Sequence, residues 1–91
     1  EEEYVETQVI ADDTRGHYLL SSIGWLPSLY REFGVFVHID VKESGKVWIQ
    51  HDGTDLVIAE WMNEEGIPKS DIVLGFMAPY RREDVEEYAV G

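Results

Sequence analysis

The stretch from Gly34 to Thr54 constrains the fold most, because three local patterns agree there on a β-hairpin. Apolar residues occupy every second position from Val35 to Val41, the period expected of a strand that buries one face. Residues Glu43 to Gly45 supply turn chemistry, since glycine accepts positive φ. A second alternating run follows from Lys46 to His51 and ends at Asp52 and Gly53. We therefore expect two antiparallel strands, with Val35, Val37, Ile39 and Val41 sharing the buried face.

The flanking segments predict the other elements. From Tyr4 to Val9 the pattern is that of a half-buried strand, and Gly16 to Trp25 reads as a second strand, antiparallel to the first. Leu26 to Glu32 is either a loop with one helical turn or the start of a long third strand, and the proline favours the loop. Ile72 to Phe76 is a short apolar strand, and Tyr88 to Val90 docks as a terminal segment.

One main helix is predicted from Thr54 to Glu65. Thr54 suits the N-cap position, and Gly66 with Pro68 ends the helix. Apolar residues from Val57 to Met62 form a broad stripe, in which Trp61 is expected in the core. The fold class is therefore α+β, an antiparallel sheet of about four or five strands with this helix on one face.

Composition narrows the possible partners. The 91 residues fit a single domain, residues 1–91, and carry 19 acidic against 7 basic side chains, a net charge of -12. Such a surface repels polyanions, so direct nucleic-acid binding is not expected. No cysteine is present, which fits a reducing compartment, and the sequence has no leader or membrane-span pattern. We expect a cytoplasmic protein.

A metal site is the sharpest chemical candidate. Alternation places His38 and Asp40 on one face of a strand, and His51 ends its neighbour. Imidazole and carboxylate groups are suitable ligands for a divalent metal. A hydrolase using His38, Asp40 and His51 is the related alternative. Asp52 and Asp55 lie nearby, but they also suit a turn and a helix start, and the histidine and Asp40 side chains also suit a solvated sheet face.

Arg15 and His17, beside Asp12 and Asp13, are a second candidate. They suggest either an acid–base pair or a small anion site. A solvent-exposed ion pair at a strand entrance explains the same residues. Among the aromatic residues, Trp48 shares a strand face with Lys46 and Gln50, so it lies either against a second layer or exposed for a partner.

Several runs resemble the XisI family, the fdxN-element excision controlling factors. These runs, spread from about Asp13 to Ala89, are Arg15-Gly16-His17-Tyr18, Gly24-Trp25, Val37-His38-Ile39-Asp40, Gly45-Lys46-Val47-Trp48-Ile49-Gln50, Asp52-Gly53-Thr54, Gly66-Ile67-Pro68-Lys69 and Asp71-Ile72-Val73-Leu74-Gly75-Phe76. Asp55 stands where the family pattern favours glutamate, and Met77 where histidine is common. Relatives usually begin with an amphipathic helix, and on this resemblance we expect a version of the domain that lacks that helix.

The resemblance implies an α+β accessory or regulatory protein in programmed excision of a DNA element, with no established catalytic residue and no known cofactor. It implies a protein partner, either XisH, which resembles a nuclease-fold protein, or a recombinase. An acidic protein beside a nuclease suggests antitoxin-like inhibition. Arg15, His17, Tyr18, Trp25, His38, Asp40, Trp48, Asp52 and Thr54 are the family-motif residues expected to serve interaction. The edge strand from Tyr4 and Trp48 also fit a homo-oligomer.

Overall fold

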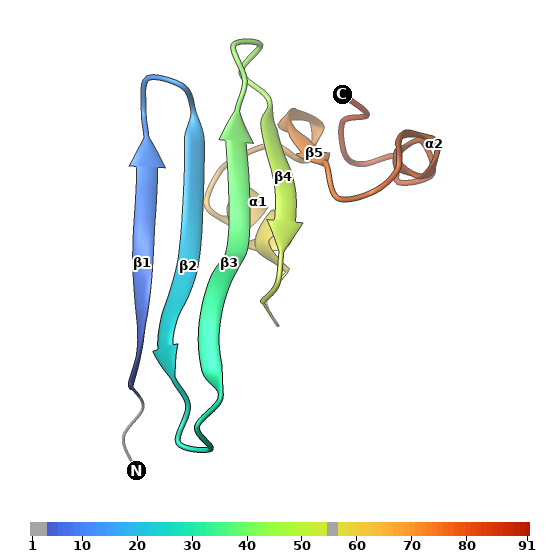
Figure 1. Ribbon diagram of the computed structural model, residues 1–91. Coiled ribbons are helices and arrows are strands. Elements are labelled where there is room, and N and C mark those ends of the chain that lie inside the picture. Colours follow the sequence, from blue (N-terminus) through green and yellow to red (C-terminus); the bar gives the residue numbers. More distant parts are fainter. Residues whose placement is uncertain (1–3, 55–56) are drawn as a thin grey trace.

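The computed structural model describes residues 4–54 and 57–91, which build a five-stranded sheet (Figure 1). The strands are β1 Tyr4–Asp12, β2 His17–Trp25, β3 Arg31–Val41, β4 Val47–Asp52 and β5 Ile72–Leu74. The helices are α1 Ile58–Glu64, the single turn α2 Pro79–Arg82 and a 3-10 turn at Lys69–Asp71. Strand order follows chain order, and among the pairs of named strands in the described residues β4–β5 is the parallel one. The predicted α+β class is confirmed.

The central hairpin forms as predicted. Its turn is closed by hydrogen bonds from Gly45 N to Lys42 O, 2.9 Å, and from Lys42 N to Lys46 O, 3.0 Å. Gly45 has a φ of 92°, a backbone angle that a residue with a side chain adopts only with strain. The first strand of this hairpin, β3, begins earlier than expected, at Arg31. The predicted loop from Leu26 to Glu32 therefore ends at Tyr30.

The hydrophobic core lies on one side of β4 and β5. In Figure 1, α1 lies behind β3 and β4. Six buried residues form the core cluster: Val47, Ile49, Ala59, Met62, Ile72 and Leu74. The C-terminal segment docks as predicted, since Ala89 bridges to Val73 and Tyr88 packs against the cluster. We call this side the helix side of the sheet.

The start of the main helix differs from the prediction. The helix runs from Ile58 to Glu64, and Val57, without a side-chain cap, stands at the N-cap position predicted for Thr54. Asp52 supplies the missing acceptor from the end of β4, because its Oδ2 accepts from Ile58 N at 2.9 Å. The C-terminal prediction is confirmed, since Gly66 has a φ of 116° directly after the C-cap.

The placement of Trp61 in the core was wrong. Its side chain is 55% exposed, whereas Ala59 and Met62 are buried. At about 100° per residue, Trp61 lies roughly a quarter-turn outside the stripe that contacts β4. A helix of seven residues buries only that narrow stripe.

In the described part of the chain, no helix is long and apolar enough to span a membrane.

A β-bulge corrects the predicted faces of β3. Leu20 pairs with Val37, but Ser21 pairs with Val35, so Phe36 is an extra residue between them. Adjacent residues of β2 point to opposite sides, and therefore Val35 and Val37 do as well. Val37 is 3% exposed on the helix side, whereas Val35 is 45% exposed on the other side. The expectation that Val35, Val37, Ile39 and Val41 share one buried face is wrong at Val35, which lies on the other face. Val41 lies on the helix side but is 41% exposed, so its expected burial is wrong too.

The first strand is less buried than predicted. β1 is the edge of the sheet, and Val9, expected on its buried face, is 72% exposed. The reason is that the helix layer lies over the β4–β5 end of the sheet (Figure 1). The side opposite the helix side is called the open face below, and over β1 to β3 it carries Ile10, Ile23, Phe33 and Val35.

Candidate functional site

Two histidines and an aspartate meet on the open face. Nδ1 of His17 lies 2.7 Å from Oδ1 of Asp40, and Nε2 of His38 lies 2.9 Å from the same oxygen. The two rings meet edge to face, with their centroids 6.3 Å apart. One carboxylate oxygen therefore accepts hydrogen bonds from both imidazoles. We call this set the His–Asp–His cluster.

Strand register brings the cluster together. His17 is paired directly with Asp40 across β2 and β3, and His38 lies two residues before Asp40 on the same face. Gly16 fixes the start of β2, because its carbonyl accepts from Val41 N at 2.7 Å. Its φ is 76°, and a Cβ there would overlap with the Val41 carbonyl oxygen. Only glycine therefore fits the turn that sets His17 opposite Asp40.

Gln50 completes the surroundings of Asp40. Its Nε2 donates to Oδ2 of Asp40 at 3.0 Å, so both carboxylate oxygens have partners. Burial of Asp40 alone would raise its pKa, but hydrogen bonds from His17, Gln50 and His38 outweigh burial and lower the pKa below the ordinary value. Asp40, 7% exposed, is therefore an anion at neutral pH, which makes it a buried, fixed negative charge between two basic rings.

The structure places the other predicted ligands differently. His51 is the cross-strand partner of His38, but it is exposed, and its Nε2 lies near Gly53. His17 takes its place beside His38 and Asp40. Asp52 serves the chain after β4, accepting from Thr54 N at 3.0 Å and Thr54 Oγ1 at 2.6 Å. Asp55 lies outside the described residues.

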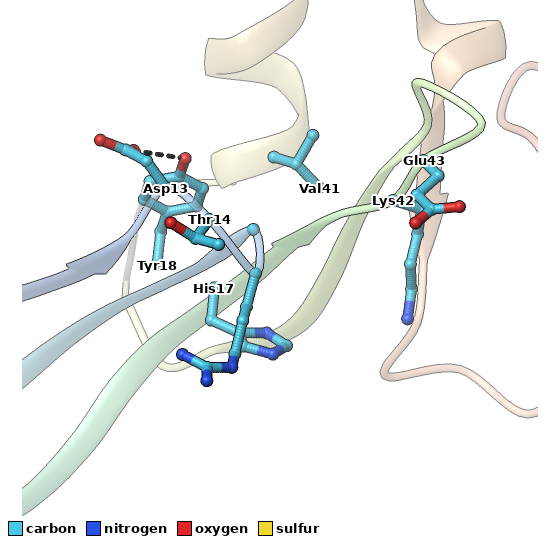
Figure 2. Close-up of a pocket in the computed structure, with 9 residues that line it drawn as sticks. Asp13, Thr14, His17, Tyr18, Val41, Lys42 and Glu43 are labelled. Atoms are coloured by element: carbon cyan, nitrogen blue, oxygen red, sulfur yellow. Dashed lines mark hydrogen bonds between the residues drawn. The ribbon is translucent and has the colours of Figure 1, made fainter.

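Arg15 and His17, predicted as a pair, have separate partners. Arg15 Nη1 lies 3.1 Å from Oδ2 of Asp12, and its side chain is 74% exposed. Tyr18 donates to Asp13 at 2.7 Å, drawn as a dashed line in Figure 2. This hydrogen bond raises the pKa of Tyr18. Asp13, Arg15 and Tyr18 line a hollow of about 450 Å³ between the β1–β2 turn and Lys42 (Figure 2).

The two strand tryptophans lie in different surroundings. Trp48 is half-buried, with the guanidinium of Arg82 5.0 Å and Nζ of Lys42 5.5 Å from its ring centroid. The structure thus favours the second-layer alternative for Trp48. Trp25 is 49% exposed, and Arg31 lies over its ring at 5.3 Å.

An apolar hollow continues the open face away from the cluster. It measures about 240 Å³ and is lined by Gln8, Ile10, Ser21, Ile23, Phe33, Gly34 and Val35. Phe33 is 71% exposed and Ile10 is 45% exposed. Exposed apolar side chains matter when they form one patch, as they do here across three strands.

A protein-family model described as XisI protein matches residues 1–90. The chain belongs to the XisI family. A crystal structure of a XisI-like protein from Anabaena variabilis ATCC 29413 is 40% identical, with a TM-score of 0.85 over 100% of this chain and 81% of that one. The XisI fdxN element excision controlling factor from the same organism is 34% identical, with a TM-score of 0.75 over 98% of this chain and 78% of that one. Comparison with curated proteins yields no match.

Sequence reasoning missed part of the cluster in this XisI-family chain. It selected His17 but grouped it with Arg15, and it gave Gln50 no role beside Asp40. A register in which the strand from Gly16 pairs with both of its neighbours would have set His17 opposite Asp40. The residue types alone do not predict this register, because it depends on the length of the turn between β2 and β3 and on the bulge at Phe36.

Proposed function

We propose that this XisI-family protein is an accessory, regulatory subunit in the recombination of a DNA element, and that it acts by binding another protein instead of by catalysis. The observation that carries the proposal is the apolar patch on the open face, where Ile10, Phe33 and Val35 are 45%, 71% and 45% exposed. The relative from Anabaena variabilis that is described as an excision controlling factor supports the process.

The proposed partner is a nuclease-like protein of the XisH type. Nineteen acidic side chains against seven basic ones attract a basic protein and repel DNA. A nuclease carries a basic groove for its own substrate. Within the proposal, the acidic protein covers that groove and restrains the nuclease, as an antitoxin restrains a toxin. Apolar contacts on the open face hold the complex, and charge steers its formation.

Co-purification tests the proposal. The tagged chain is expressed with the XisH-like protein or with the recombinase, and each mixture is captured at low and at high salt. We expect the XisH-like protein to be retained at both salt concentrations. No complex at either salt overturns the proposal, and retention of the recombinase alone replaces the proposed partner.

A matched pair of variants assigns the surface. Phe33 on the open face and Val9 on the helix side of β1 are 71% and 72% exposed. Phe33→Asp should abolish capture, and Val9→Asp should leave it intact. Equal capture by both variants would remove the open face from the interface. A stable homodimer of the chain alone, broken by Phe33→Asp, would assign the face to a second copy and contradict the proposal.

A further inference from the structure

We propose that His17, His38 and Asp40 bind one divalent transition-metal ion, of which zinc is the best match. One ligand atom from each of the three side chains lies within 4.8 Å of the other two. Nδ1 of His17 and Nε2 of His38 both contact Oδ1 of Asp40. Imidazole nitrogen and carboxylate oxygen are ordinary zinc ligands, and three protein ligands leave one position open. This inference is independent of the proposed protein partner.

The distances fit a site close to its metal-bound geometry. Zinc binds histidine nitrogen and carboxylate oxygen at about 2.0–2.2 Å, so the donors of a tetrahedral site stand about 3.4 Å apart. In the structure the His17–Asp40 and His38–Asp40 separations are 2.7 and 2.9 Å. The first must widen by about 0.7 Å and the second by about 0.5 Å, and the two imidazole nitrogens must stand about 3.4 Å from each other as well, which requires rotation of the imidazoles.

Surrounding groups prepare the carboxylate for this role. Gln50 holds Oδ2 of Asp40 at 3.0 Å, which orients the carboxylate and leaves Oδ1 to the two rings. Hydrogen-bonded partners of this kind orient metal ligands and tune their affinity. The Asp40 side chain is only 10% exposed, so its position is set by packing as well.

The site is also open to solvent on one side. The side chains of His17 and His38 are 47% and 36% exposed, so an ion reaches the nitrogens without local unfolding. The net charge of -12 raises the local concentration of cations near the protein. Magnesium and calcium prefer all-oxygen sites, so the two imidazoles favour a transition metal.

A purely structural reading of the cluster makes a different prediction. If the three side chains only tie β2 to β3, the protein neither binds zinc stoichiometrically nor gains stability from it. If they form a site, zinc binds the folded state alone and raises the melting temperature by mass action. Because imidazoles bind metals in their neutral form, the effect should weaken in acid.

The third histidine of the chain provides a matched control. The protein is stripped with a chelator, dialysed and titrated with zinc chloride by calorimetry, and cobalt(II) absorption reports the coordination geometry. We expect one zinc per chain and a tetrahedral cobalt band. His17→Gln and His38→Gln should each weaken zinc binding at least about tenfold, whereas His51→Gln should leave it unchanged.

A measurement on the unmodified chain keeps the test decisive if a variant folds poorly. Zinc should shift the imidazole NMR signals of His17 and His38 and leave those of His51 in place. Absence of stoichiometric zinc binding by the unmodified chain overturns the site. Equal weakening by all three substitutions, or shifts confined to His51, overturns it as well and indicates diffuse binding to surface charge.

Discussion

His17 and Asp40 face each other across β2 and β3, with Nδ1 of one 2.7 Å from Oδ1 of the other. This hydrogen bond connects β2 and β3 on the open face, opposite Ile39, which packs against the core cluster on the helix side. It also ties the family-motif run around Gly16 to the run around Asp40. Stability of this end of the sheet therefore depends on the ionisation of one buried carboxylate.

Acid should destabilise the protein through Asp40. Its pKa is lower in the folded state than in the unfolded chain, so its contribution is fully present above the unfolded value of about 3.9. That contribution is lost as pH falls through the lower, folded value. Thermal melts across the acid range should show this loss, and Asp40→Asn should flatten it. Asp84→Asn, at an exposed position, is the control. An unchanged acid profile in Asp40→Asn would contradict the prediction.

Asp52 should hold the connection between β4 and α1. Its carboxylate accepts from Thr54 N, Thr54 Oγ1 and Ile58 N, so truncation leaves the first turn of α1 without that acceptor. We expect Asp52→Ala to lower the free energy of unfolding by about 1–3 kcal/mol, and Asp52→Asn to lower it less. Urea denaturation followed by tryptophan fluorescence measures both. A loss below about 0.5 kcal/mol for the alanine variant would show that the hydrogen bonds of Asp52 contribute little to stability.

Gly16 should tolerate no side chain. A Cβ at its φ of 76° meets the carbonyl oxygen of Val41, which is backbone and cannot rotate away. We expect Gly16→Ala to cost about 2 kcal/mol or more. Gly45→Ala, with a φ of 92° but open space around the new atom, isolates the cost of backbone strain alone. Equal losses in the two variants would mean that the contact with Val41 adds nothing.

Unaided DNA binding should be absent. A chain with a net charge of -12 meets repulsion from every phosphate, and the repulsion grows as salt is removed. A fluorescently labelled duplex titrated with the protein at low salt should show no change in anisotropy. Saturable binding that strengthens at low salt would be evidence for a basic surface that the sequence does not suggest.

Local patterns predicted the strands and their class well. The hairpin from Gly34 to Thr54 was recognised because alternation, turn residues and a second alternating run depend only on neighbours in sequence. The strand at Ile72 and the glycine stop at Gly66 follow from the same kind of local chemistry. The helix start was misplaced because its acceptor, Asp52, belongs to the preceding strand and reaches forward six residues.

The candidate site was predicted only in part, because its geometry is non-local. His38 and Asp40 share a strand face, which the period of two reveals directly. His17 lies 23 residues away from Asp40 and joins it through the pairing of β2 with β3. Composition cannot distinguish His17 from His51 as the second ring, and only the register makes that choice.

Phe36, which has no partner in β2, reverses the alternation of faces along β3. Without it, the apolar residues on either side would all lie on the same side of the strand and compete for a place under one short helix. With it, the apolar residues of β3 lie on both faces of the sheet. Val37 and Ile39, after Phe36, pack on the helix side, and Phe33 and Val35, before it, are exposed on the open face. Deletion of this one residue would therefore remove the β3 part of the apolar patch from the open face, even if the other strands still form.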